Sequence, residues 1–94
     1  MIKHIVCFKL KDFADTEEAK RVLESMDGKV PTLRGIEVHV DELRSDRSYD
    51  VILEVLLDDF DALEAYQADP YHVEVVKKHM HAVRQSSIAM DFTI

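Results

Sequence analysis

The chain has 94 residues, 47% of them apolar and 33% charged, which are the length and composition of one globular domain over residues 1–94. Nineteen acidic residues against twelve basic ones give a net charge of −7. This argues against nucleic acid as a partner, because phosphate binding needs a basic surface. No apolar run is long enough to span a membrane, and Lys3 and Lys9 interrupt the segment where a signal peptide would be apolar. The sequence therefore predicts a soluble, cytoplasmic protein with no membrane contact.

Residues 2–10 predict a β-strand, because β-branched and aromatic residues recur there with period two. A helix is expected next, starting at a capping box formed by Asp15 and Glu18. Gly28 suits the left-handed position that ends a helix, and Pro31 prevents its continuation.

Two more strands, over 35–43 and 49–57, are expected to pair as an antiparallel hairpin, since a short polar segment joins them. A helix that starts at Asp58 or Asp59 and stops at Pro70 follows.

A further helix is expected to begin with Asp69 as its N-cap and Pro70 in its first turn. Its apolar stripe is predicted to consist of Val73, Val76, Met80 and Val83. A final strand is expected over 87–94. There Ile88, Met90, Phe92 and Ile94 are assigned to the helix-covered face, and Ala89, Asp91 and Thr93 to the opposite face.

The element order β-α-β-β-α-α-β indicates an α+β fold of the ferredoxin-like, split βαβ type. A four-stranded antiparallel sheet with helices on one face is expected. The uncovered face is too apolar to favour bare water, which predicts a homodimer with two sheets face to face, a dimeric α/β barrel. The expected dimer-interface residues are Ile5, Cys7, Ile52, Glu54 and Leu56.

Three segments in register resemble the stress-responsive α/β-barrel (Dabb) family, which belongs to the dimeric α+β barrel superfamily. They are the opening Met-Ile-Lys-His-Ile-Val-Cys-Phe-Lys-Leu-Lys of residues 1–11, the Asp-Ala-Leu-Glu-Ala-Tyr-Gln-Ala-Asp-Pro-Tyr-His-Val of residues 61–73, and the Met-Asp-Phe of residues 90–92. The resemblance covers the whole chain and implies a homodimeric barrel of two four-stranded sheets.

A plant member of that family closes a linear polyketide by an aldol step, with a Tyr and a His that match Tyr66 and His72 here. A pocket His of its first strand matches His4. The sequence departs from the family at two positions. The family has a His before the proline where this chain has Asp69, and a pocket His on the third strand where this chain has Val51. The resemblance thus implies the fold in full and the chemistry in part.

The residues themselves indicate a pocket between helices and sheet. The break at Pro70 lets Tyr66 and His72 point at the same patch of sheet, to which the first strand also presents His4. An imidazole suits proton transfer near neutral pH, so His72 and Tyr66 are the candidate catalytic pair. The expected substrate-binding residues are His4, Val6, Phe8 and Val51. For each of the three polar residues, ordinary packing in the core is the alternative.

No metal or cofactor is predicted. His79 and His81 lie on opposite sides of a helix, and His72 lies about 10 Å from His79, too far for one ion. Cys7 lies in mid-strand, without the pattern of a thiol nucleophile, and is expected to be inert.

Three functions remain open. The first is a dimer that binds a small apolar, oxygen-bearing molecule, with His/Tyr acid–base chemistry of the polyketide-cyclase type. The second is a non-catalytic structural or stress-related dimer. The third is a relative of cofactor-free monooxygenases, which share this barrel architecture, although the chain has no Trp or Asn to mark such a site.

Overall fold

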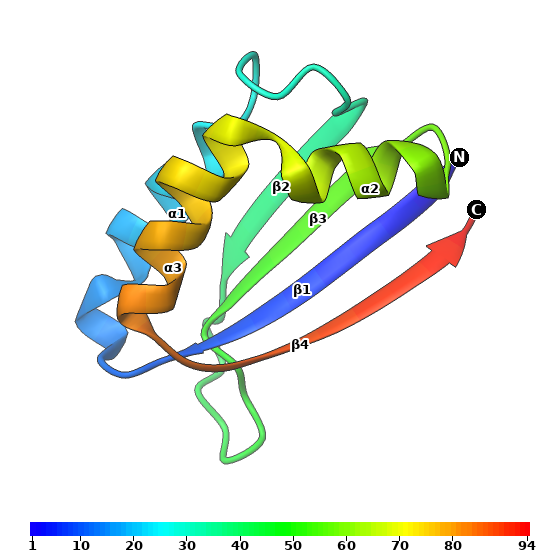
Figure 1. The fold of residues 1–94 in the computed structure, drawn as a ribbon. Helices are drawn as coiled ribbons and strands as arrows, with labels where there is room; N and C mark the ends of the chain where they lie inside the picture. The colour runs from blue at the N-terminus through cyan, green and yellow to red at the C-terminus, as the bar shows by residue number, and fades with distance from the viewer.

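The structure, a computed structural model, describes residues 1–94 and has the predicted α+β architecture. Figure 1 shows the sheet with its helices on one face. None of these helices is long and apolar enough to cross a membrane. In chain order the elements are β1 (Ile2–Leu10), η1 (Phe13–Asp15), α1 (Thr16–Glu24), β2 (Gly35–Val40), β3 (Val51–Leu57), α2 (Phe60–Ala68), η2 (His72–Lys77), α3 (Lys78–Val83) and β4 (Arg84–Thr93).

The sheet has the strand order β2-β3-β1-β4, and all neighbouring strands are antiparallel. This is the ferredoxin-like arrangement, so the predicted fold class and the β2–β3 hairpin are confirmed. The strand bounds differ from the prediction. β2 ends at Val40, β3 begins at Val51, and β4 begins at Arg84, three residues earlier than expected.

The helix ends are set by aspartates, though not all of the predicted ones. Asp59 caps α2 by accepting from the amide of Ala62 at 2.8 Å, and Asp69 accepts from the amides of Tyr71 and His72. Asp15 makes no capping bond, and the predicted capping box is wrong. The side chain of Asp12 instead accepts from an amide of η1, a short 3₁₀ turn that precedes α1.

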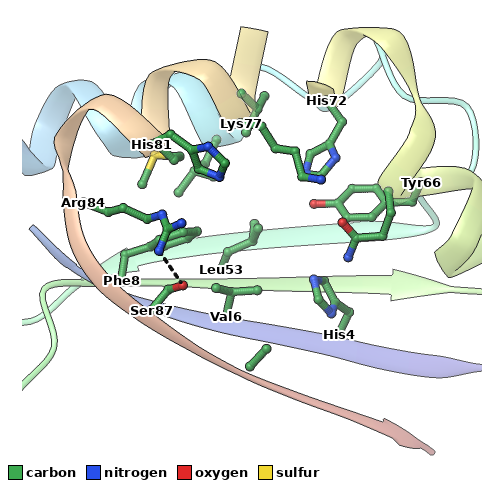
Figure 2. Close-up of a pocket in the computed structure, with 15 residues that line it drawn as sticks. His4, Val6, Phe8, Leu53, Tyr66, His72, Lys77, His81, Arg84 and Ser87 are labelled. Atoms are coloured by element: carbon green, nitrogen blue, oxygen red, sulfur yellow. Dashed lines mark hydrogen bonds between the residues drawn. The ribbon is translucent and has the colours of Figure 1, made fainter. Parts of the chain in front are cut away.

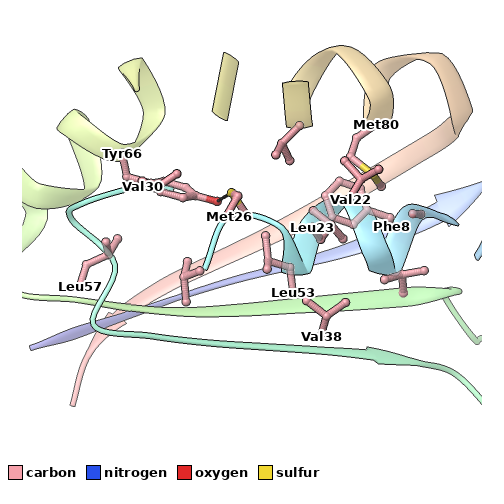
Figure 3. Packing of buried hydrophobic residues seen from close by; sticks show 14 of the residues in the cluster. Phe8, Val22, Leu23, Met26, Val30, Val38, Leu53, Leu57, Tyr66 and Met80 are labelled. Atoms are coloured by element: carbon pink, nitrogen blue, oxygen red, sulfur yellow. Dashed lines mark hydrogen bonds between the residues drawn. The ribbon is translucent and has the colours of Figure 1, made fainter. Parts of the chain in front are cut away.

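The hydrophobic core lies between the sheet and the helices. Figure 3 shows Leu23 and Met26 of the α1 region packed over Leu53 of β3, with Tyr66 at one end of the cluster. Fully burying a large apolar side chain of this kind stabilises the fold by about 1.5–3 kcal/mol. Because this cluster fixes α1 and β3, it also fixes the walls of the pocket that lies beside it.

η2 is a π-helix, in which the backbone bonds run from residue i to residue i+5. This wider turn changes the predicted apolar stripe: Val76 and Met80 are buried, but Val73 is 41% exposed. An α-helix would place residues five apart about 140° from one another. The π-turn brings His72 and Lys77 to the same side.

The face assignment of β4 was wrong. Asp91 pairs with His4, and Ala89 pairs with Val6, so these residues face the helix side of the sheet. Met90 lies opposite Ile5, on the uncovered face. The assignment failed because β4 is an edge strand whose apolar side does not face the helices. The large apolar residues on its uncovered side are Ile88, Met90 and Phe92, at 53%, 69% and 39% exposure.

Candidate functional site

A pocket of about 230 Å³ lies between the sheet and the segment from α2 to α3. Figure 2 shows His4, Val6 and Ser87 on the sheet side and His72 and Lys77 above them. Eight of the fifteen lining residues are hydrophobic and seven are polar or charged, and such a mixture of apolar walls and placed polar groups is typical of a small-molecule site. The remaining lining residues are Phe8, Leu23, Leu53, Tyr66, Gln67, Val76, Met80, His81, Arg84 and Ala89.

Tyr66 and His72 form one end of the pocket. Their rings stack with centroids 4.3 Å apart and an angle of 30° between their planes. The Tyr66 hydroxyl lies 3.7 Å from the sulfur of Met26, which is only a weak acceptor. The Nδ1 atom of His72 is buried and has no protein partner. Because this nitrogen is closed off by protein atoms, the ring can meet a bound molecule only through its other nitrogen, Nε2.

His4 completes this end of the pocket. Its ring meets the Tyr66 ring edge-on, with centroids 5.8 Å apart, and its Nδ1 bonds to the carboxylate of Asp91. A carboxylate at Nδ1 holds a proton on that nitrogen and orients the imidazole. Asp91 reaches this ring because β4 lies beside β1 and pairs Asp91 with His4 in the strand register.

Burial favours the neutral forms of His72 and Tyr66. Burial lowers the pKa of His72 below its usual value, and the positive charge of Lys77 lowers it further, whereas the charge of Asp69 acts in the opposite direction. Burial raises the pKa of the Tyr66 phenol far above its ordinary value. At neutral pH the site therefore holds a neutral imidazole that can accept a proton, beside a phenol that keeps its proton.

The structure brings together His4, Tyr66 and His72, as the sequence suggested, with Val6 and Phe8 beside them. Val51 does not line the pocket. It is 1% exposed in the core, and Leu53, two residues further along β3, occupies the pocket wall.

Sequence reasoning did not place six polar residues at the site: Asp91, which bonds to His4, and the lining residues Gln67, Lys77, His81, Arg84 and Ser87. Only Asp91 could have been found from the sequence. It is the one charged residue among residues 88–94, and a carboxylate among apolar side chains needs a polar partner. The orientations of Lys77 and Arg84 depend on a π-turn and on a strand irregularity that the residue pattern does not reveal.

Replacing His72 by Gln is expected to flatten the pH dependence of stability. The unfolded chain binds a proton at His72 as the pH falls through about 6.5, whereas the folded chain, with a lowered pKa, does not. Stability that is fully present above about pH 7.5 is therefore lost as the pH falls through 6.5 toward the pKa of the folded state. Urea unfolding at one fixed protein concentration, from about pH 7.5 to pH 5, measures this difference. Parallel curves for the wild type and His72→Gln would contradict it.

Comparison with known proteins identifies a family and several solved structures with the same fold. The family model described as the stress responsive A/B barrel domain matches residues 2–94. No protein with a curated description matches the chain.

Three solved structures illustrate the similarity of fold. A dimeric ferredoxin-like protein of unknown function from Bacteroides fragilis is 25% identical, with a TM-score of 0.86 over 99% of this chain and 95% of that one. A dimeric ferredoxin-like protein of unknown function from Thermobifida fusca is 23% identical, with a TM-score of 0.84 over 99% of this chain and 90% of that one. An antibiotic biosynthesis monooxygenase is 16% identical, with a TM-score of 0.77 over 100% of this chain and 98% of that one.

Proposed function

The chain belongs to the stress responsive A/B barrel domain (Dabb) family, and on that premise we propose that it is a homodimer whose helix–sheet pocket binds a small, apolar, oxygen-bearing molecule. The observation that carries this proposal is a pocket of about 230 Å³ whose lining brings the rings of His4, Tyr66 and His72 together at one end. Rings that served only to pack the core would have no open space beside them.

The uncovered face of the sheet supports the dimer. Besides Ile5, Cys7, Ile52 and Leu56, it carries the three exposed apolar residues of β4. On this face Lys3 pairs with Glu54 at 3.7 Å, and Glu37, opposite Glu54, has no ion-pair partner within the chain. Contiguous exposed apolar surface of this kind marks an interface, and two solved relatives of the same fold are described as dimeric.

The chemistry we propose for the site is proton removal beside a carbonyl group, as in polyketide cyclisation. A neutral His72 accepts the proton, and the Tyr66 hydroxyl, held only by the weak acceptor of Met26, turns to donate to the substrate oxygen. His4, oriented by Asp91, places a second imidazole at the same end of the pocket.

A monooxygenase-like function is the second candidate, because the barrel resembles that of an antibiotic biosynthesis monooxygenase. The chain contains no Trp and no Asn, and the polar lining consists of imidazoles, a phenol and cations, which suits acid–base work better.

Titration with acetophenone, a small aromatic ketone, is expected to shift the amide signals of pocket residues in an NMR spectrum, with a Kd in about the millimolar range for a ligand this small. Ala89 lies on the pocket floor, at a position that no large side chain fills. Ala89→Phe is therefore expected to abolish binding, whereas Ala65→Phe, on the exposed side of α2, leaves it intact. Shifts spread over the whole surface, or binding that survives Ala89→Phe, would argue against the pocket.

A further inference from the structure

The charge of the pocket lining differs from that of the protein. The chain has 19 acidic residues and a net charge of −7, yet no Asp or Glu lines the pocket. Its lining includes the cationic side chains of Lys77 and Arg84, and the nearby carboxylate of Asp91 lies outside the lining, where it bonds to His4. A concave site that gathers positive charge within an acidic protein attracts anions and repels cations.

Neither of the two cations is occupied by an acidic partner. Lys9, Arg21, Arg34 and Arg44 all form ion pairs elsewhere in the fold. Lys77 forms none, and Arg84 donates only to the hydroxyl of Ser87 at 3.5 Å, the contact drawn in Figure 2. Both side chains are half-buried, so they are partly desolvated and still free to pair.

Two local irregularities of the backbone direct these cations into the pocket. The π-turn of η2 places Lys77 on the same side as His72, as described above. In β4 the pairing with β1 shifts register between Lys9 and Leu10, so Leu10 pairs with Arg84 rather than with Gln85. A shift of one residue exchanges the faces of a strand, and bulges of this kind re-aim a side chain. Regular elements would have turned both cations elsewhere.

We propose that the ligand of this pocket is a small apolar monocarboxylic acid. Its carboxylate pairs with Lys77 and Arg84, its body lies on Val6 and Phe8, and an oxygen or other polar atom meets His72. The inference rests on the function proposed above and adds the chemical class of the ligand. A volume of about 230 Å³ equals roughly eight water volumes and suits one ring with a few substituents, not a nucleotide or a long lipid.

The test compares benzoate with benzamide, its neutral counterpart of the same shape, and with inorganic phosphate, all at one ionic strength and followed by NMR. Benzoate is expected to bind at least about tenfold more tightly than benzamide, and phosphate more weakly than benzoate. Lys77→Gln and Arg84→Gln should each weaken benzoate binding by about tenfold and leave benzamide binding unchanged. Lys78→Gln and Arg47→Gln remove the same charges from exposed positions outside the pocket and should change neither.

The outcomes separate this inference from the proposed function. If benzamide binds as tightly as benzoate, or if the two pocket variants behave like their controls, the carboxylate inference is wrong and the pocket function stands. If phosphate binds as well as benzoate, the cationic end is a general anion site and the inference of an apolar acid is also wrong. If acetophenone, benzamide and benzoate all leave the pocket signals unmoved, both the function and the inference fall.

Discussion

Changing Ile52 to Asp is expected to convert the protein from a dimer, with roughly twice the chain mass, into folded monomers. Ile52 lies on β3 opposite Cys7, in the middle of the uncovered sheet face. Each apolar side chain of this face gains about 1.5–3 kcal/mol when it is fully buried, whereas a carboxylate at its centre must be desolvated without a partner. Light scattering at micromolar concentration gives the mass, and circular dichroism shows whether the helices remain.

Leu43→Asp is the matched control for this experiment. Leu43 is 81% exposed in the loop between β2 and β3, so the same change there should leave the mass unchanged. A wild-type protein that is a monomer at micromolar concentration, or an Ile52→Asp variant that stays dimeric, would contradict the face-to-face arrangement.

Met90 allows the same experiment to test the side on which β4 carries its apolar residues. The sequence pattern assigned Met90 to the helix side, where an aspartate would disrupt the core and unfold the chain. In the structure Met90 is 69% exposed on the uncovered face, beside Ile5. Met90→Asp should therefore give a folded monomer like Ile52→Asp, and an unfolded product would favour the original assignment.

The order of elements was predictable because each strand and helix carries its own period of apolar residues. The central strands β1 and β3 pack one face against the helices, so their alternation gave the correct side. β4 alternates equally well, but it is an edge strand that the core does not cover. Its pattern indicated a strand and could not indicate which face the apolar residues occupy. The misplacement of Asp91, and so the missing partner of His4, follows from that one error.

The site was predictable to a smaller extent. Pro70 and the spacing of Tyr66 and His72 were sufficient to bring these two rings together. The π-turn was not predictable, because the residues of η2 fit an α-helix equally well, and its hydrogen bonds depend on the packing around it. For this reason the sequence placed Val73 in the stripe, where the structure has it largely exposed, and missed Lys77.

If the pocket performs proton transfer, replacing His72 by Ala is expected to lower the rate by about 100- to 10,000-fold, the range that a positioned general base contributes. The reaction to follow is deuterium uptake into the methyl group of acetophenone in heavy water, which requires only that a base remove a proton beside the carbonyl. The lowered pKa of His72 predicts that, as the pH falls, the wild-type rate begins to decline at a lower pH than it would with an ordinary histidine of pKa about 6.5. His79 lies in α3, directly after η2, and does not line the pocket. The control variant His79→Ala should therefore retain the full rate.

Two further variants assign the roles within the site. Tyr66→Phe keeps the ring that stacks on His72 and removes only the hydroxyl, so a loss of rate there reports hydrogen bonding to the substrate oxygen rather than loss of packing. Asp91→Asn keeps the shape of the partner of His4 but removes its charge. A large loss in Asp91→Asn and His4→Ala, with little in His72→Ala, would make His4 the base, because Asp91 can act on the reaction only by orienting that ring. A rate equal to that of buffer in the wild type, with acetophenone bound, would leave the pocket with a binding role alone.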